Sequence, residues 1–165
     1  MNLNRINELD RAGVEEAFSS CCGSRSWAQA MIAGRPYASE DELIRQCEAS
    51  WQKLSTADWL EAFAAHPKIG DIESLKKKYS STKAWAEQEQ SGVGGAAEEL
   101  LKELSALNEA YERKFGYIFI VCATGKSAYE MLGILKRRID NPPDEELKTA
   151  IEEQKKITRL RLEKL

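Results

Sequence analysis

His66 is the only histidine in the chain, and histidine is the side chain best suited to proton transfer near neutral pH. It follows the apolar run Phe63-Ala64-Ala65 and directly precedes Pro67, so it stands where an amphipathic helix must stop. A helix C-terminus favours the protonated imidazole, and the proline restricts the backbone beside it. His66 is therefore a candidate general acid or base. The alternative is a histidine that only hydrogen-bonds the last helical carbonyl groups.

Glu89 and Gln90 form the second candidate group, in the run Glu89-Gln90-Ser91-Gly92. The run places a carboxylate, an amide and a hydroxyl next to one another at the edge of an expected helix. By itself this pattern is more typical of a solvated helix surface, because Glu and Gln side chains are ordinarily exposed.

Arg159 and Arg161 are the third candidates, near the end of the sequence. Residues two apart on a helix point about 200° away from each other, so the two guanidinium groups cannot both face one ligand. One of them could reach a substrate carboxylate or carbonyl while the other stays solvated. A basic, water-exposed helix end is the alternative.

No metal site is expected. The cysteines lack the paired spacing of a zinc site, and a single histidine cannot complete one. We interpret them as reduced thiols, because a chain of this length needs no disulfide framework. They are Cys21, Cys22, Cys47 and Cys122.

The composition indicates one compact domain, residues 1–165. The chain has 165 residues, of which 42% are hydrophobic and 31% are charged. Its formal net charge of -3 provides no positive field that would attract nucleic acid. No stretch approaches the roughly 18 to 20 apolar residues of a membrane span, and the first residues lack the apolar block of a secretion signal. We therefore expect a soluble, cytoplasmic protein that binds neither nucleic acid nor a membrane.

Helical periodicity dominates the chain and predicts an all-α fold, a single compact bundle of about seven or eight helices. In one of them, Ser55 is placed to cap the first turn and Asp58 stands where the acid of a capping box belongs. The expected helices span residues 39–54, 55–66, 96–115, 127–139 and 144–165. The last of these has an apolar face made of Leu147, Ile151, Ile157 and Leu160.

Residues 116–125 depart from this pattern. The run is bounded by Gly116 and Gly125 and is rich in aromatic and β-branched residues, as a buried strand would be. It has no obvious partner strand, and a lone strand cannot satisfy its backbone groups. We expect either a distorted helix or an extended stretch lined by helices. A second irregular connection is expected over residues 22–27 together with Arg35-Pro36-Tyr37, and it could form a pocket wall. Trp27 itself is more typical of a core residue.

Four blocks of sequence, in order along the chain, resemble one family. The blocks are Trp59 to Asp71 with His66-Pro67 inside it, Glu89 to Gly92, Asn108 to Phe119, and Lys156 to Leu162. Shorter matches extend the likeness over nearly the whole chain, at Cys22-Gly23-Ser24, Trp27 and Arg35-Pro36-Tyr37. The chain is similar to the 2-oxo-4-hydroxy-4-carboxy-5-ureidoimidazoline decarboxylases, abbreviated OHCU decarboxylases.

This resemblance implies an all-helical, usually homodimeric protein that catalyses the last step of urate breakdown. In that step the ureidoimidazoline loses carbon dioxide and gives (S)-allantoin, without a cofactor. Carried over by motif, His66 and Glu89 are the catalytic pair, Gln90 and Arg161 bind the substrate, and Pro67 shapes the pocket.

One residue departs from the family pattern. The family commonly has a serine three residues before the Glu-Gln pair, where this chain has Ala86. A hydroxyl contact to the substrate is then missing, or it is supplied by another residue such as Ser91.

The chemistry of this reaction explains why no cofactor is implied. The substrate carries a ring C=N bond β to the carboxylate, and this bond accepts the electrons that carbon dioxide leaves behind, a task that cofactors otherwise perform. Two alternatives stay open. The chain could be a non-catalytic helical interaction module, in which His66 is only a cap and Glu89 a surface residue, or an enzyme that acts on a related ureide.

Overall fold

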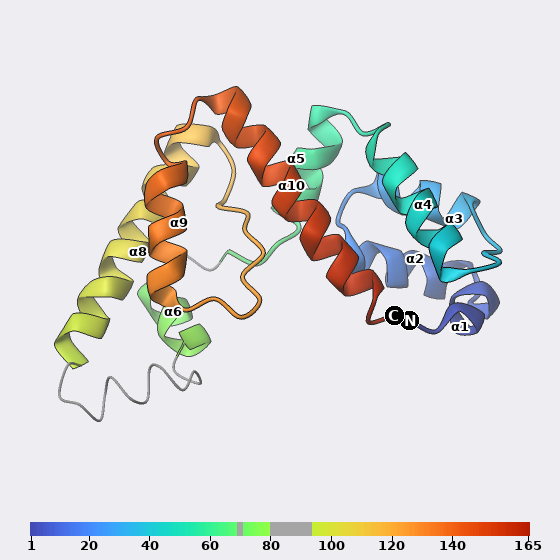
Figure 1. Cartoon of the computed structure of the whole chain (residues 1–165), viewed down its shortest axis with the longest axis horizontal. Coiled ribbons are helices and arrows are strands. Elements are labelled where there is room, and N and C mark those ends of the chain that lie inside the picture. Colours follow the sequence, from blue (N-terminus) through green and yellow to red (C-terminus); the bar gives the residue numbers. More distant parts are fainter. Residues whose placement is uncertain (69–70, 80–93) are drawn as a thin grey trace. The chain divides into compact units, whose positions relative to one another are not determined.

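The computed structural model describes residues 1–68, 71–79 and 94–165, and within these ranges it contains nine helices and no strand (Figure 1). The predicted all-α class is confirmed. None of the described helices is long and apolar enough to cross a bilayer. The helices are α1 (Leu3–Glu8), α2 (Arg11–Cys21), α3 (Arg25–Ala33), α4 (Glu40–Trp51), α5 (Thr56–Ala64), α6 (Ile72–Tyr79), α8 (Gly94–Phe115), α9 (Ala128–Arg138) and α10 (Pro143–Leu162).

The helices gather into two compact units. The first unit comprises Met1–His66 and Ile151–Leu165, and the second comprises Pro67–Ala150. Helix α10 contributes its first residues to the second unit and its remaining residues to the first. That residues 1–165 form one domain stays a prediction.

All five predicted helices are present, and side-chain caps define where three of them begin. Ser55 and Asp58 form the predicted capping box of α5, in which the Ser55 N–H donates to the Asp58 carboxylate at 2.8 Å. Ser127 and Glu130 form the same box at the start of α9, and Ser39 caps α4. Each cap satisfies N–H groups that the first helical turn leaves without helical partners.

The irregular connection predicted over residues 22–27 is wrong for its second half, because α3 begins at Arg25. Ser24 caps this helix, accepting a hydrogen bond from the Trp27 N–H at 3.3 Å. Trp27, Ala28 and Met31 then make one buried face. The prediction of Trp27 as a core residue is confirmed.

Residues 116–127 form the irregular segment between α8 and α9. The distorted-helix alternative is wrong, and the extended stretch is correct: alternate residues of the segment, Tyr117, Phe119 and Val121, pack on the core of the second unit. Gly116 and Gly125 bound the segment with φ angles of 78° and 75°, which glycine adopts without steric cost.

Helices α2 to α5 build the first unit through contacts of α3 with α2, α4 and α5. Its core is apolar and includes Phe18, Trp27, Met31 and Leu43, all fully buried. Leu162 at the end of α10 belongs to the same core. The end of α10 therefore packs against the first unit through Leu162.

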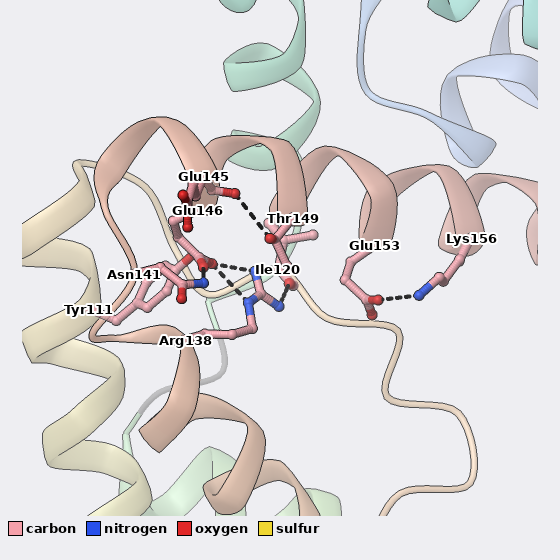
Figure 2. A network of polar contacts seen from close by, with 9 residues as sticks. All are labelled: Tyr111, Ile120, Arg138, Asn141, Glu145, Glu146, Thr149, Glu153 and Lys156. Atoms are coloured by element: carbon pink, nitrogen blue, oxygen red, sulfur yellow. Dashed lines mark hydrogen bonds and ion pairs between the residues drawn. The ribbon is translucent and has the colours of Figure 1, made fainter.

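The second unit packs α8 against α6 and α9, and Figure 1 shows α8 and α9 running side by side. A buried polar network joins α9 and α10 to the irregular segment (Figure 2). Arg138 donates to the Glu146 carboxylate at 2.8 Å and to the backbone oxygen of Ile120 at 2.7 Å. Tyr111 and Asn141 also donate to Glu146. Because Glu146 is fully buried, these donors supply the partners that its charge needs.

Candidate active site

His66 lies directly after α5, as the sequence predicts. The backbone N–H of Ala65 donates to the carbonyl oxygens of Glu61 and Phe63, and the His66 N–H donates to Phe63 O at 3.1 Å. These bonds tighten the last turn, and the exposed Pro67 follows at once. The chain thus leaves the helix with the imidazole at its end, half-buried in the first unit.

The link between α2 and α3 passes very close to this helix end. A Cβ placed on Gly23 would lie 2.1 Å from the Cβ of Ala65, the residue before His66. Real Cβ atoms do not approach this closely. Gly23 therefore lets the backbone of residues 22–24 pack against the end of α5, next to the residue that precedes His66.

The imidazole of His66 is hydrogen-bonded to a buried amide. Its Nε2 lies 2.7 Å from Oε1 of Gln154, a residue of α10 with no solvent exposure. The Gln154 Nε2 donates in turn to the hydroxyl of Thr158, also fully buried, at 3.2 Å. The ring is thus held by a polar chain that runs along one face of α10.

The pKa of His66 lies below its ordinary value of 6.5. Burial of the ring is the largest cause, because a protonated imidazole loses its hydration there. The nearby positive charge of Arg161 also lowers this pKa, whereas the hydrogen bond to Gln154 raises it. Burial is thus the main influence on this pKa, and the neutral ring is favoured at neutral pH.

The two C-terminal arginines occupy different surroundings in the first unit. Arg161 Nη1 lies 3.3 Å from the backbone oxygens of Ser20 and Cys21 at the end of α2. The positive charge of Arg161 lowers the pKa of His66. Arg159 instead pairs with Glu48 at 3.4 Å and with Glu163 at 3.7 Å on the surface. Arg159 is exposed and Arg161 is half-buried, so the two arginines differ in exposure as expected, whereas contact with a substrate stays a prediction.

The remaining predicted site residues are placed less fully. Glu89 and Gln90 lie outside the described residues, as do Ala86 and Ser91. Pro67 is described and is exposed. Their roles stay predictions.

Gln154 and Thr158 were not singled out from the sequence, although a signal existed. The most deeply buried residues of α10 recur at every fourth position: Glu146, Ala150, Gln154, Thr158 and Leu162. The predicted apolar face is thus wrong, because the aliphatic residues assigned to it are only half-buried beside this stripe. Residues four apart lie on the same face of a helix, so Gln154 and Thr158 share a face with Ala150 and Leu162. This spacing could have identified both polar residues.

A surface hollow of about 460 Å³ in the first unit holds none of the predicted site residues. Arg25 pairs there with Glu61 at 2.6 Å, and the Ser26 hydroxyl donates to Asp58 at 2.6 Å.

The sequence model of OHCU decarboxylase matches residues 7–163. The chain belongs to the OHCU decarboxylase family. The predicted family is confirmed, and with it the predicted enzyme class of that family, the carboxy-lyases.

Individual relatives support the assignment to this family. The chain is 36% identical over 151 residues to the uric acid degradation bifunctional protein TTL of Arabidopsis thaliana, a match that covers 92% of this chain and 47% of that protein. It thus spans about half the length of that relative. It is 25% identical over 163 residues to the OHCU decarboxylase of Haloferax volcanii, covering 98% of this chain and 94% of the relative.

A solved structure supports the fold directly. A crystal structure of OHCU decarboxylase in the presence of (S)-allantoin matches with a TM-score of 0.72 at 38% identity. The match covers 91% of this chain and 96% of that one. That relative was thus crystallised together with the compound expected as product.

Proposed function

We propose that this chain decarboxylates OHCU to (S)-allantoin. The observation that carries the proposal is the surroundings of His66 in a chain of this family: a half-buried neutral imidazole, fixed by Gln154 and close to the charge of Arg161. A histidine that served only as a helix cap would turn its ring to the last carbonyls of α5. Here the ring nitrogen is bonded to another helix instead.

The reaction needs proton transfers but no external electron acceptor. The bond between C4 and the carboxylate breaks and carbon dioxide leaves; the electron pair forms a C4=C5 double bond, and the π electrons of the ring C=N bond move to nitrogen, which takes a proton. C5 then accepts a proton on one face, while the 4-hydroxyl loses its proton and C4 becomes a carbonyl. The net change replaces carbon dioxide by one proton, so the protein's task is orientation and proton transfer.

The residues have the following roles in this proposal. Neutral His66 hydrogen-bonds the 4-hydroxyl and carboxylate region, and Glu89 handles a proton on the hydroxyl or the ring nitrogen. Gln90 and Arg161 hold the ureido and ring carbonyls, and Pro67 shapes the pocket. These roles rest on the family motif, with the described geometry of His66 and Arg161 supporting two of them.

The other expectations belong to the same proposal. The substrate is a small ureidoimidazoline, no cofactor takes part, and the protein is a cytoplasmic homodimer. The (S)-allantoin present with the related crystal structure supports a small-molecule site.

The stereochemistry of the product tests this function. The protein is given freshly generated OHCU, and the circular dichroism of the allantoin is followed with time. We expect the S enantiomer to form faster than the uncatalysed, racemic background. Racemic allantoin at the background rate would rule out the proposed activity.

The two alternatives give different results. A non-catalytic interaction module would show no thermal shift with allantoin, whereas an enzyme with a product site is stabilised by ligand well above its dissociation constant. An enzyme for a related ureide would turn over that compound faster than OHCU in a side-by-side assay.

A further inference from the structure

We propose that Gln154 is a positioning residue that holds His66 in the tautomer with its proton on Nε2. Nδ1 is then the ring nitrogen that can accept a proton. The assignment of Nδ1 as the reacting atom rests on the proposed function, whereas the tautomer itself does not.

The first support is the hydrogen bond itself. The 2.7 Å separation between His66 Nε2 and Gln154 Oε1 is that of a well-formed bond, and a carbonyl oxygen can only accept. The ring nitrogen must therefore donate. In a neutral imidazole, a proton on Nε2 leaves Nδ1 unprotonated.

The second support is the order of donors and acceptors beyond Gln154. An amide can turn over and exchange its oxygen and nitrogen, so its partners decide its direction. The Gln154 Nε2 donates to the Thr158 hydroxyl at 3.2 Å, so the amide nitrogen is directed at Thr158 and the amide oxygen at His66.

The third support is burial. Gln154 and Thr158 are fully buried, so water does not compete for their polar groups. A buried amide that loses a partner stays unsatisfied, and this cost keeps Gln154 hydrogen-bonded to both His66 and Thr158. These residues and His66 belong to the first unit.

The single histidine makes the tautomer directly measurable. Long-range ¹⁵N NMR of the imidazole distinguishes a protonated from an unprotonated ring nitrogen, and here one set of signals needs no assignment. The spectrum is recorded at about pH 8, where a histidine of ordinary pKa is neutral. We expect the wild-type protein to carry its proton on Nε2.

Three substitutions test the role of Gln154. Gln154→Met keeps the approximate volume and removes the amide, so we expect a mixture of tautomers and a kcat lowered about 10- to 100-fold, with KM changed less than about threefold. Gln154→Glu offers only acceptors, so we expect the Nε2–H tautomer to persist. Thr158→Val removes the group that orients the amide, and we expect a smaller change in the same direction as Gln154→Met.

Two matched controls separate positioning from stability. Gln46→Met removes a different side-chain amide of the first unit, whose Nε2 donates a hydrogen bond to Ala30 O at 3.1 Å. This change does not alter the hydrogen bond of His66. Thr149→Val repeats the threonine change at a half-buried position of α10, where the hydroxyl donates to Glu145 O at 3.0 Å. Both controls should keep the wild-type tautomer and kcat.

The results then decide the proposal. A wild-type proton on Nδ1, an unchanged tautomer in Gln154→Met, or a reversed tautomer in Gln154→Glu would overturn it. If Gln154→Met does not fold, Thr158→Val gives the same decision. A wild-type protein without turnover would end the proposed function, but a tautomer that shifts in Gln154→Met would still support the positioning of His66.

Discussion

His66 shows how its surroundings set the chemistry of one side chain. The end of α5 would favour the imidazolium, yet burial lowers the pKa of His66 and Arg161 lowers it further. Gln154 acts on the same ring through a hydrogen bond. The neutral form and one ring nitrogen are therefore both selected, which suits a group that must accept a proton.

Replacement of His66 tests whether this ring carries the reaction. We expect His66→Asn to lower kcat by about 10² to 10⁴-fold, the usual contribution of a general acid or base. The measurement is the initial rate of (S)-allantoin formation. More than about a tenth of the wild-type rate would contradict the assignment, because that loss is below this range.

Replacement of Arg161 tests substrate binding. If its contacts serve the ground state and the transition state equally, Arg161→Ala raises KM with a smaller change in kcat. Loss of a hydrogen bond to a charged group predicts a rise of roughly 10- to 100-fold.

Arg159→Ala is the matched control. Its surface ion pairs with Glu48 and Glu163 contribute little, so both constants should stay within about twofold of the wild type. A rise in KM with Arg159→Ala, and none with Arg161→Ala, would exchange the two assignments.

At the scale of the elements, local signals predict the helices well. The capping box of Ser55 and Asp58 is visible in the sequence because its residues are three apart. The buried face of α10 is not predicted correctly, because Gln154 and Thr158 are polar and their burial depends on partners distant in sequence. Hydrophobic periodicity does not detect a buried polar stripe.

The approach of Gly23 to α5 gives a prediction at this scale. In Gly23→Ala the new Cβ would meet Ala65 Cβ at 2.1 Å, so the α2–α3 link or the end of α5 must move. We expect the free energy of unfolding to fall by about 1–3 kcal/mol, as for other overpacked sites. Since Ala65 precedes His66, kcat should fall as well.

Urea unfolding and initial rates measure both effects of Gly23→Ala. Gly133→Ala is the control, because Gly133 lies inside α9 and its nearest neighbouring atom would be 3.7 Å from the new Cβ. There alanine should raise stability by about 0.5–1 kcal/mol and leave kcat unchanged. Equal stability of Gly23→Ala and the wild type would show that this packing is not tight.

At the scale of the whole molecule, the sequence predicts class and family but not every spatial relation. The all-α class follows from helical periodicity along the chain, and the family follows from blocks that span it. His66 and Arg161 interact electrostatically although they are 95 positions apart in the sequence. Local sequence patterns carry no information about such distant pairs. The family resemblance, rather than periodicity, supplied that pairing.

The pH dependence of stability is a property of all the titrating groups together. A base whose pKa is lowered on folding binds its proton more tightly when unfolded. The contribution of His66 to the free energy of unfolding is therefore complete above its ordinary pKa of 6.5. It is lost as the pH falls through the lower pKa of the folded protein. Hydrogen bonds lower the pKa of four carboxyl groups, so their contributions are lost only at more acidic pH. These groups are Asp58, Glu61, Asp71 and Glu130.

We therefore expect the free energy of unfolding to be constant just above neutral pH and to fall in two steps on acidification. The upper step begins near pH 6.5, and the lower step begins near the ordinary carboxyl values of 3.8 to 4.5. Because the chain has one histidine, His66→Asn should remove the upper step and keep the lower one. Urea unfolding at a series of pH values, followed by tryptophan fluorescence, measures both. An upper step that persists in His66→Asn would mean that burial of this imidazole does not depress its pKa.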